Sequence, residues 1–511
     1  MKASSRSVSS AKNMIIGFIA QLGLLILSFI GRTVFLHYLG IDYLGITGLY
    51  TSILSVLSLT ELGLGNVILF SLYKPIANND SRMISALLRY FKRLYTYIAF
   101  AIAAIGLLLI PFLKYIIQSE LSDADLIKYY LILLTSSVLS YFVAHSTAEI
   151  TARQELFVIK QINVVSSLAV NVLQIITLIL WRNYYLYLAL SIVSTLITNY
   201  LISRYSNTHY EHLTSHAESI DIPKFEIIKN IKSTFIYKVG VTLINYTDNI
   251  LISAMIGTVW VGYYSNYSMV VSAIQMYFGI IITSVIPSIG NLNVENNSEK
   301  SRSTFFVLLL FFHWSAAFGA ISFFFLFGDL IPLWLGSKYL LDTPVLIVIC
   351  LNFYLSNAIN PVWMYREATG LFSRVKYLML TTAGFNLILS VFLGKLFGLA
   401  GILFATALSR ILTVVWYEPK ILFKEKLGGN VGQYWLTQFK YLLLSGISFV
   451  ACYGITLFLS HSLIGMVLKA LMFFVVSCII FIIGSLKSNA LKSLIGYTNR
   501  ILRGLKNKIN I

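Results

Sequence analysis

The chain has 511 residues, of which 58% are hydrophobic and only 11% are charged, and its mean hydropathy is +0.80. A water-soluble globule has too little interior to bury so much apolar side chain, so the composition excludes a soluble protein and predicts a multi-pass membrane protein. The 38 Lys and Arg against 20 Asp and Glu give a net charge of +18, which in such a chain indicates basic cytoplasmic loops rather than nucleic-acid binding.

Apolar runs of about 20 residues, the length that a helix needs to cross the hydrocarbon core, predict fourteen spans. In chain order they lie at 13–38, 44–70, 94–116, 128–148, 160–181, 184–203, 232–256, 260–288, 304–328, 343–365, 375–396, 398–417, 440–460 and 464–486. The first is too long for a signal peptide and predicts an uncleaved span. Because the runs lack the period-two alternation of barrel strands, we expect an all-α protein.

The basic residues predict the orientation of these spans. Most Lys and Arg fall in the segments that this layout places on the side of the N-terminus, so both termini are expected in the cytoplasm of a bacterial cell. The tail at 487–511 has six basic residues, no acid and apolar residues at helical spacing, which predicts an amphipathic helix on the inner leaflet.

An internal repeat emerges when the chain is shifted by 217 residues. Three glycine pairs then coincide, together with the pair Tyr50 and Tyr267: Gly23 with Gly240, Gly40 with Gly257 and Gly45 with Gly262. Six spans precede the seventh, so both copies start on the same side of the membrane and are parallel repeats related by an axis along the membrane normal. Two such lobes with a cleft between them predict a transporter.

The repeat and the polar loops predict the division of the chain. We expect an N-terminal lobe at 1–203, a cytoplasmic linker at 204–231 and a C-terminal lobe at 232–417. Spans thirteen and fourteen with their preceding loop occupy 418–486, and the basic tail occupies 487–511.

Ionisable residues within spans are costly and are therefore candidates for function. Arg32 and Lys238 are predicted to attract an anionic head group, with Asp248 pairing with Arg32 when the site is empty. The alternative is a structural Arg–Asp bond between the two lobes. Glu61 is a candidate for ion or proton coupling, or for pairing with a neighbouring helix.

Further candidates lie in or near later spans. His313 could couple proton flow, since histidine titrates near neutral pH, or could be a hydrogen-bonded packing residue. Arg366 and Glu367 are interpreted as a cytoplasmic gate or as a surface ion pair. Glu149 and Arg153 are expected in a solvated network at a helix end. No metal site, P-loop or hydrolase motif is predicted, so no cofactor is expected, and H⁺ or Na⁺ coupling is left open.

Several motifs resemble those of a known family. They are LGIDYLGITGLY at 39–50, LSLTELGLG at 57–65, LYKPIA at 72–77 and WMYREATGLF at 363–372. These segments resemble bacterial Wzx-type polysaccharide flippases, which belong to the multidrug/oligosaccharidyl-lipid/polysaccharide (MOP) exporter superfamily. The resemblance implies a V-shaped fold like that of the multidrug and toxin extrusion (MATE) transporters, here with two additional C-terminal helices.

The resemblance also implies a substrate. It is an undecaprenyl-diphosphate-linked oligosaccharide, moved from the inner to the outer leaflet by alternating access for capsule or other surface polysaccharide. Arg32 is the residue that we match to the diphosphate-binding arginines of related flippases. Membrane lipids, polysaccharide polymerases and assembly proteins are the expected partners, and nucleic acid is not.

Three other functions stay open at this point. A MATE-type drug/cation antiporter would favour acidic residues in its cavity, whereas cations here at least equal acids. A lipid II flippase is poorly separated from the first choice by sequence. An integral polysaccharide polymerase would be an enzyme, but no outer loop is long enough to hold its site.

Overall fold

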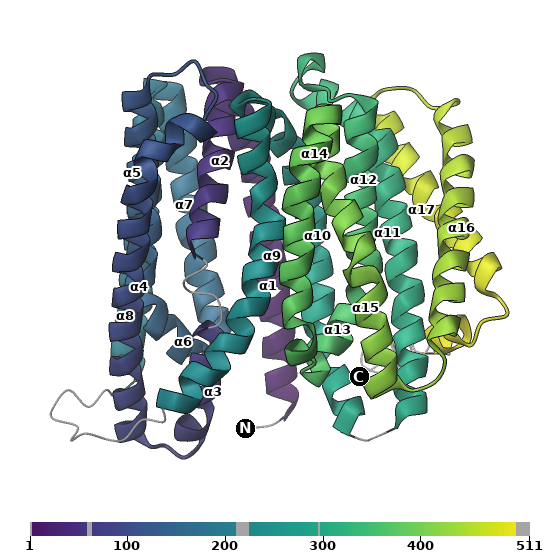
Figure 1. Cartoon of the computed structure of the whole chain (residues 1–511), viewed down its shortest axis with the longest axis horizontal. Coiled ribbons are helices and arrows are strands. Elements are labelled where there is room, and N and C mark those ends of the chain that lie inside the picture. The colour runs from purple at the N-terminus through teal and green to yellow at the C-terminus, as the bar shows by residue number, and fades with distance from the viewer. Residues whose placement is uncertain (1–2, 59–63, 211–223, 295–296, 497–511) are drawn as a thin grey trace. The chain divides into compact units, whose positions relative to one another are not determined.

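The computed structural model describes residues 3–58, 64–210, 224–294 and 297–496, and in these ranges all regular structure is helical (Figure 1). The helices of the first half are α1 Ala3–Tyr38, α2 Ile41–Leu57, α3 Leu64–Ala77, α4 Ser81–Ile116, α5 Asp123–Ser140, α6 Ala144–Ala152, α7 Leu156–Trp181 and α8 Tyr184–His209. Those of the second half are α9 Lys224–Met255, α10 Thr258–Val294, α11 Ser298–Trp334, α12 Thr343–Ala358, α13 Asn360–Thr369, α14 Phe372–Leu412, α15 Val414–Leu422, α16 Val431–Thr456 and α17 Leu463–Ser485. The all-α prediction is confirmed.

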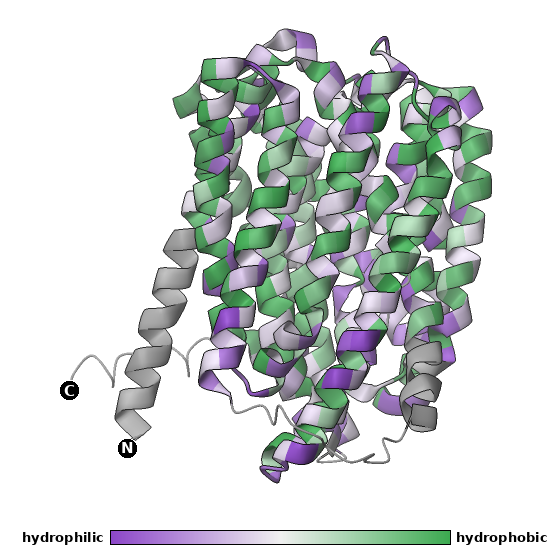
Figure 2. Ribbon diagram, turned by 90° about the vertical axis from the view of Figure 1, so that its left-hand side faces the viewer, coloured by the Kyte–Doolittle hydropathy of each residue, from purple (hydrophilic) through white to green (hydrophobic). Residues whose placement is uncertain are grey.

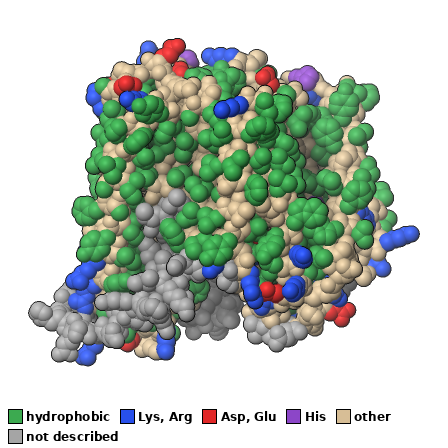
Figure 3. Space-filling model, viewed as in Figure 1, with side chains coloured by type: hydrophobic (Ala, Val, Ile, Leu, Met, Phe, Trp, Pro, Cys, Tyr) green, Lys and Arg blue, Asp and Glu red, His purple; other side chains and the backbone are tan. Residues whose placement is uncertain are grey.

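The helices have the composition of membrane spans. Among the described residues, eleven helical segments are long and apolar enough to cross a membrane. Hydrophobic residues cover the lengths of the helices, and charged side chains gather at the helix ends (Figures 2 and 3). The chain is a multi-pass membrane protein, while its fourteen spans and the orientation of its termini stay predictions.

Several predicted spans differ from the observed helices. The span at 128–148 is interrupted by a 3-10 turn at Tyr141–Val143, which separates α5 from α6. The span at 343–365 is likewise divided into α12 and α13 at Ile359. Two predicted spans lie within α14, where Gly398 has a φ of 58° that interrupts the helical geometry between them.

The chain divides into two compact units, 1–265 and 266–511. The boundary falls inside α10, because α9 packs against α2, α3 and α4 of the first unit. The predicted lobes divide the chain at the linker instead, and their boundaries stay predictions about the duplication.

Element boundaries recur at the spacing of the predicted repeat. The following boundaries lie 217 residues apart: the ends of α1 and α9 at Tyr38 and Met255, the starts of α2 and α10 at Ile41 and Thr258, the starts of α4 and α11 at Ser81 and Ser298, and the ends of α6 and α13 at Ala152 and Thr369. The N-caps correspond as well, since Asp80 accepts from the Met83 amide and Asn297 from the Lys300 amide. These correspondences support a duplicated chain.

Equivalent tyrosines anchor the two copies in the same way. Tyr50 and Tyr267 are both buried, and each places its hydroxyl on the backbone near the start of a later helix. Tyr50 donates to the Leu126 carbonyl of α5 at 2.7 Å, and Tyr267 accepts from the Leu341 amide before α12 at 2.8 Å. Gly40 and Gly257 both have a positive φ, 89° and 130°, which favours glycine at these two corners.

Candidate functional site

Arg32 lies in α1, half-buried within the first unit. Its Nη1 donates to the Ser265 hydroxyl of α10 at 3.0 Å, and the phenol of Tyr187 from α8 lies within electrostatic reach of the guanidinium. Tyr187 is held in place by Phe35, whose ring centroid is 5.1 Å away in an edge-to-face arrangement. Three helices therefore position this arginine beside polar and aromatic groups.

The other predicted residues of the first unit lie on α9 or outside the described residues. Lys238 and Asp248 are both half-buried in α9. Beside Asp248, the Asn249 amide donates to the Ser52 hydroxyl of α2 at 2.9 Å, which fixes this part of α9 against α2. The pairing of Asp248 with Arg32 stays a prediction. Glu61 lies outside the described residues.

His313 of α11 is buried in the second unit among polar and aromatic side chains. Its Nδ1 is 3.1 Å from the Tyr354 hydroxyl of α12, and this hydroxyl is 3.2 Å from that of Ser445 on α16. The ring also lies 5.4 Å from that of Tyr441. This arrangement ties three helices together and favours packing, while proton coupling stays untested.

Arg366 does not form the surface pair considered with Glu367. The Arg366 side chain is 6% exposed, and its Nη1 donates to both carboxylate oxygens of Glu418 in α15, at 2.8 and 3.0 Å. Glu367 is exposed on the other side of α13. The surface interpretation was wrong because the helical turn that exposes one residue buries its neighbour, and the role of either residue in gating stays a prediction.

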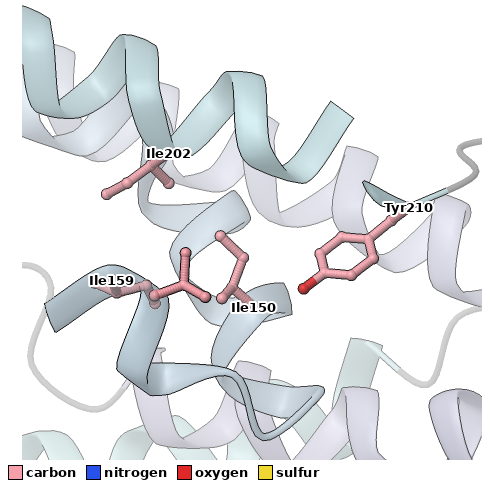
Figure 4. Close-up of a cluster of buried hydrophobic side chains, with 5 residues drawn as sticks. Ile150, Ile159, Ile202 and Tyr210 are labelled. Carbon is pink, nitrogen blue, oxygen red and sulfur yellow. The ribbon is translucent and has the colours of Figure 1, made fainter. Parts of the chain in front are cut away.

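Glu149 corresponds to Arg366 in the 217-residue register and is also buried. It accepts from Arg153 at 3.1 Å and from Ser206 of α8 at 3.1 Å. A cluster of buried apolar residues packs beside it, as Figure 4 shows: Ile150, Val158, Ile159, Ile202 and Tyr210. The expectation of a solvated network was therefore wrong for Glu149, since α8 and this cluster exclude water from its carboxylate.

Sequence reasoning missed a second buried ion pair. The Lys469 ammonium of α17 lies 2.7 Å from Asp329 Oδ2 of α11, and both side chains are at most 2% exposed. His461, in the turn before α17, contacts the other carboxylate oxygen. The rule that singled out Arg32 could have found both residues, because each is a lone charge in an otherwise apolar run.

The predicted tail begins with a helix at 489–496. Its Leu491 is buried, and together with Leu494 and Ile495 it lines an apolar groove that also includes Trp314 and Phe481. Residues 497–511 lie outside the described residues, so the inner-leaflet helix stays a prediction.

A second apolar groove of about 520 Å³ runs between α10, α11 and α17 in the second unit. Its walls include Ile274 and Phe278 of α10, Phe318 of α11 and Phe474 of α17. Trp314 and Phe311 line both grooves, so the two are neighbours along α11.

Solved structures with the same fold are transporters. The lipid II flippase MurJ in an inward closed conformation has a TM-score of 0.66 at 16% identity, covering 93% of this chain and 99% of that one. An inward-facing multidrug resistance MATE family transporter of the MOP superfamily has a TM-score of 0.55 at 15% identity, covering 78% and 96%. The MATE multidrug transporter DinF-BH has a TM-score of 0.55 at 17% identity, covering 81% and 95%. The fold thus defines a multi-pass transporter of the MurJ and MATE type.

The sequence identifies the family within that class. A family model described as "Polysaccharide biosynthesis protein" matches residues 10–293, more than half of the chain, and the protein belongs to this family. The resemblance to Wzx-type flippases is confirmed, and the chain is a transporter rather than an enzyme. No curated protein matches it.

Proposed function

We propose that this protein moves an undecaprenyl-diphosphate-linked oligosaccharide from the inner to the outer leaflet of the cytoplasmic membrane. The family, whose members act in polysaccharide biosynthesis, implies a lipid-linked glycan in general. The observation that carries the finer proposal is the position of Arg32, a half-buried cation beside Ser265 and Tyr187. A diphosphate needs cations in a site of low dielectric, where their attraction is strongest.

The surroundings of Arg32 suit the other parts of such a substrate. Tyr187 belongs to a group of aromatic rings that includes Phe35 and Tyr184, and aromatic side chains combine an apolar face with a hydrogen-bonding edge that suits sugars. The groove between α10, α11 and α17 is almost wholly apolar and provides a surface for a hydrocarbon tail. Lys238 is proposed as a second cation for the diphosphate.

The proposal is tested by depleting the protein and adding back variants. We expect depletion to raise lipid-linked oligosaccharide on the inner leaflet and to lower surface polysaccharide. Wild type should restore export, Arg32→Ala should lower it at least tenfold, and Arg32→Lys should restore only part, because lysine lacks the planar fork of donors. Arg89→Ala serves as the matched control, since Arg89 is exposed on α4.

The same experiment separates the competing functions. Unchanged polysaccharide with increased drug sensitivity would contradict the glycan proposal and favour a MATE-type antiporter, the function named for two of the solved structures with this fold. Loss of peptidoglycan precursors from the outer leaflet with normal surface polysaccharide would favour a lipid II flippase. Normal export with Arg32→Ala would contradict the role of Arg32 alone.

A further inference from the structure

Two glycines that the repeat equates lie where α2 and α10 touch. A Cβ added at Gly45 would lie 2.0 Å from the Thr258 carbonyl oxygen and 3.3 Å from the Gly262 nitrogen. A Cβ added at Gly262 would lie 2.6 Å from the Ile41 carbonyl oxygen. Both glycines are buried, so the two helices meet backbone against backbone with no room for a side chain.

This contact is reciprocal. The 217-residue register equates Gly45 with Gly262 and Ile41 with Thr258. Gly45 touches the counterpart of Ile41, and Gly262 touches Ile41 itself. A contact in which each partner presents the same patch to the other defines a two-fold axis. The first turns of α2 and α10 therefore cross about a local two-fold axis that relates the two repeats.

Neighbouring contacts extend this crossing, which we call the glycine seam and define as Gly45, Gly48, Val261 and Gly262. A Cβ added at Gly48 would lie 3.1 Å from Val261 Cγ1. Beside the seam, the loop after α4 is bonded to the α9–α10 corner, because the Gln118 carbonyl accepts from the Thr258 amide at 3.1 Å and its side chain donates to the Ala254 carbonyl at 2.7 Å. All of these residues belong to the first unit.

The seam lies between the Arg32 contact and the loops that are predicted to be outside. Ser265, the partner of Arg32, is three residues beyond Gly262 along α10, about 4.5 Å further from the Gly257 corner. The corners at Gly40 and Gly257 lie on the opposite side of the seam, at the starts of the two helices. A closed seam therefore separates Arg32 from that end of the molecule.

We propose that the glycine seam is the outer gate of the transport cycle, closed in this structure and separated when the substrate site opens to the outer side. The inference rests on the proposed function. Glycines at both positions allow the two helices to approach closely, as small residues do at helix contacts in membranes. Because no side chains interlock across Gly45 and Gly262, the helices can part without repacking their cores.

A reversible cross-link tests the gate. Gly48→Cys and Val261→Cys are combined in a chain whose Cys350, Cys452 and Cys478 are replaced by alanine. The 3.1 Å approach of Gly48 to Val261 Cγ1 brings the new Cβ atoms near the 3.5–4.5 Å spacing of a disulfide. We expect an oxidant to cross-link the pair in membranes, to lower export at least tenfold and to leave each single-cysteine variant active, with a reductant restoring export.

A second variant tests closure without a cross-link. Gly45→Leu should keep the helices apart and lower export at least tenfold, whereas Gly23→Leu, with nothing within 4 Å of its added Cβ, should export normally. A cross-link that leaves export unchanged would overturn the proposal, and so would failure of the cross-link to form.

The outcomes separate the gate from the proposed function. If depletion changes drug resistance instead of surface polysaccharide, the proposed function fails. The cross-link must then abolish drug resistance, and a cross-linked protein that still confers it would overturn the gate as well.

Discussion

At the scale of single residues, the bond between Arg366 and Glu418 can be measured apart from transport. Both side chains are buried, so removing one of them leaves an uncompensated charge away from water. We expect Arg366→Ala or Glu418→Ala to cost about 3–5 kcal/mol of stability, and Arg366→Glu with Glu418→Arg to restore part of it. Thermal unfolding of the purified protein in detergent measures the effect.

The neighbouring residue supplies the control. Glu367→Ala should change stability by no more than about 0.5 kcal/mol, because Glu367 is exposed. If Arg366→Ala is as mild as Glu367→Ala, the pair contributes nothing to stability and its geometry has another purpose.

The partners of these charges could not be found from sequence. Arg366 was recognised as a candidate, but Glu418 lies 52 residues away, and hydropathy contains no information about which helices meet. Ser265 was missed because a lone serine in an apolar run is common. The depth of Arg32 in its span, by contrast, followed directly from counting residues along α1.

At the scale of elements, α17 is fixed to α11 by a charge in an otherwise apolar contact. Lys469→Met would leave Asp329 buried without its ammonium partner, although His461 still contacts it. We expect a loss of about 3–5 kcal/mol, and Lys469→Met with Asp329→Leu should recover most of it, since two apolar groups replace the pair. Protease resistance of the α16–α17 loop measures the docking of α17.

A matched variant distinguishes the ion pair from general packing. Val450→Met changes an exposed residue of α16 and should leave the cleavage rate unchanged. If Lys469→Met has no effect, then aromatic contacts such as Phe325 with Phe473 hold α17 by themselves.

The helix pattern shows which features of an element are readable in advance. Apolar runs located the helices because each must cover the hydrocarbon core. The break at Tyr141–Val143 was missed because the run continues through it without Gly or Pro. Pro361 beside the break at Ile359 was a usable signal, since proline is tolerated in the first turn of a helix and disrupts its interior.

At the scale of the whole molecule, the duplication explains why one shift of 217 residues aligns glycines, caps and helix ends alike. Duplication preserves spacing wherever no insertion has followed, so motif and boundary move together. Chemistry is less well preserved, because Glu149 and Arg366 occupy equivalent positions with opposite charge. In both copies, however, a buried charge ties the short helix, α6 or α13, to the end of a later helix.

Orientation in the membrane is the prediction on which the outer gate depends. Ser337, after α11, is expected outside, and Asn430, before α16, is expected inside, because the basic loops gather on the latter side. Both residues are exposed. In a chain whose three cysteines are replaced, a membrane-impermeant maleimide on intact cells should label Ser337→Cys, and should label Asn430→Cys only after permeabilisation. The reverse pattern would place the glycine seam at the cytoplasmic side and make it an inner gate, so the cross-link would then trap the protein open to the outer side.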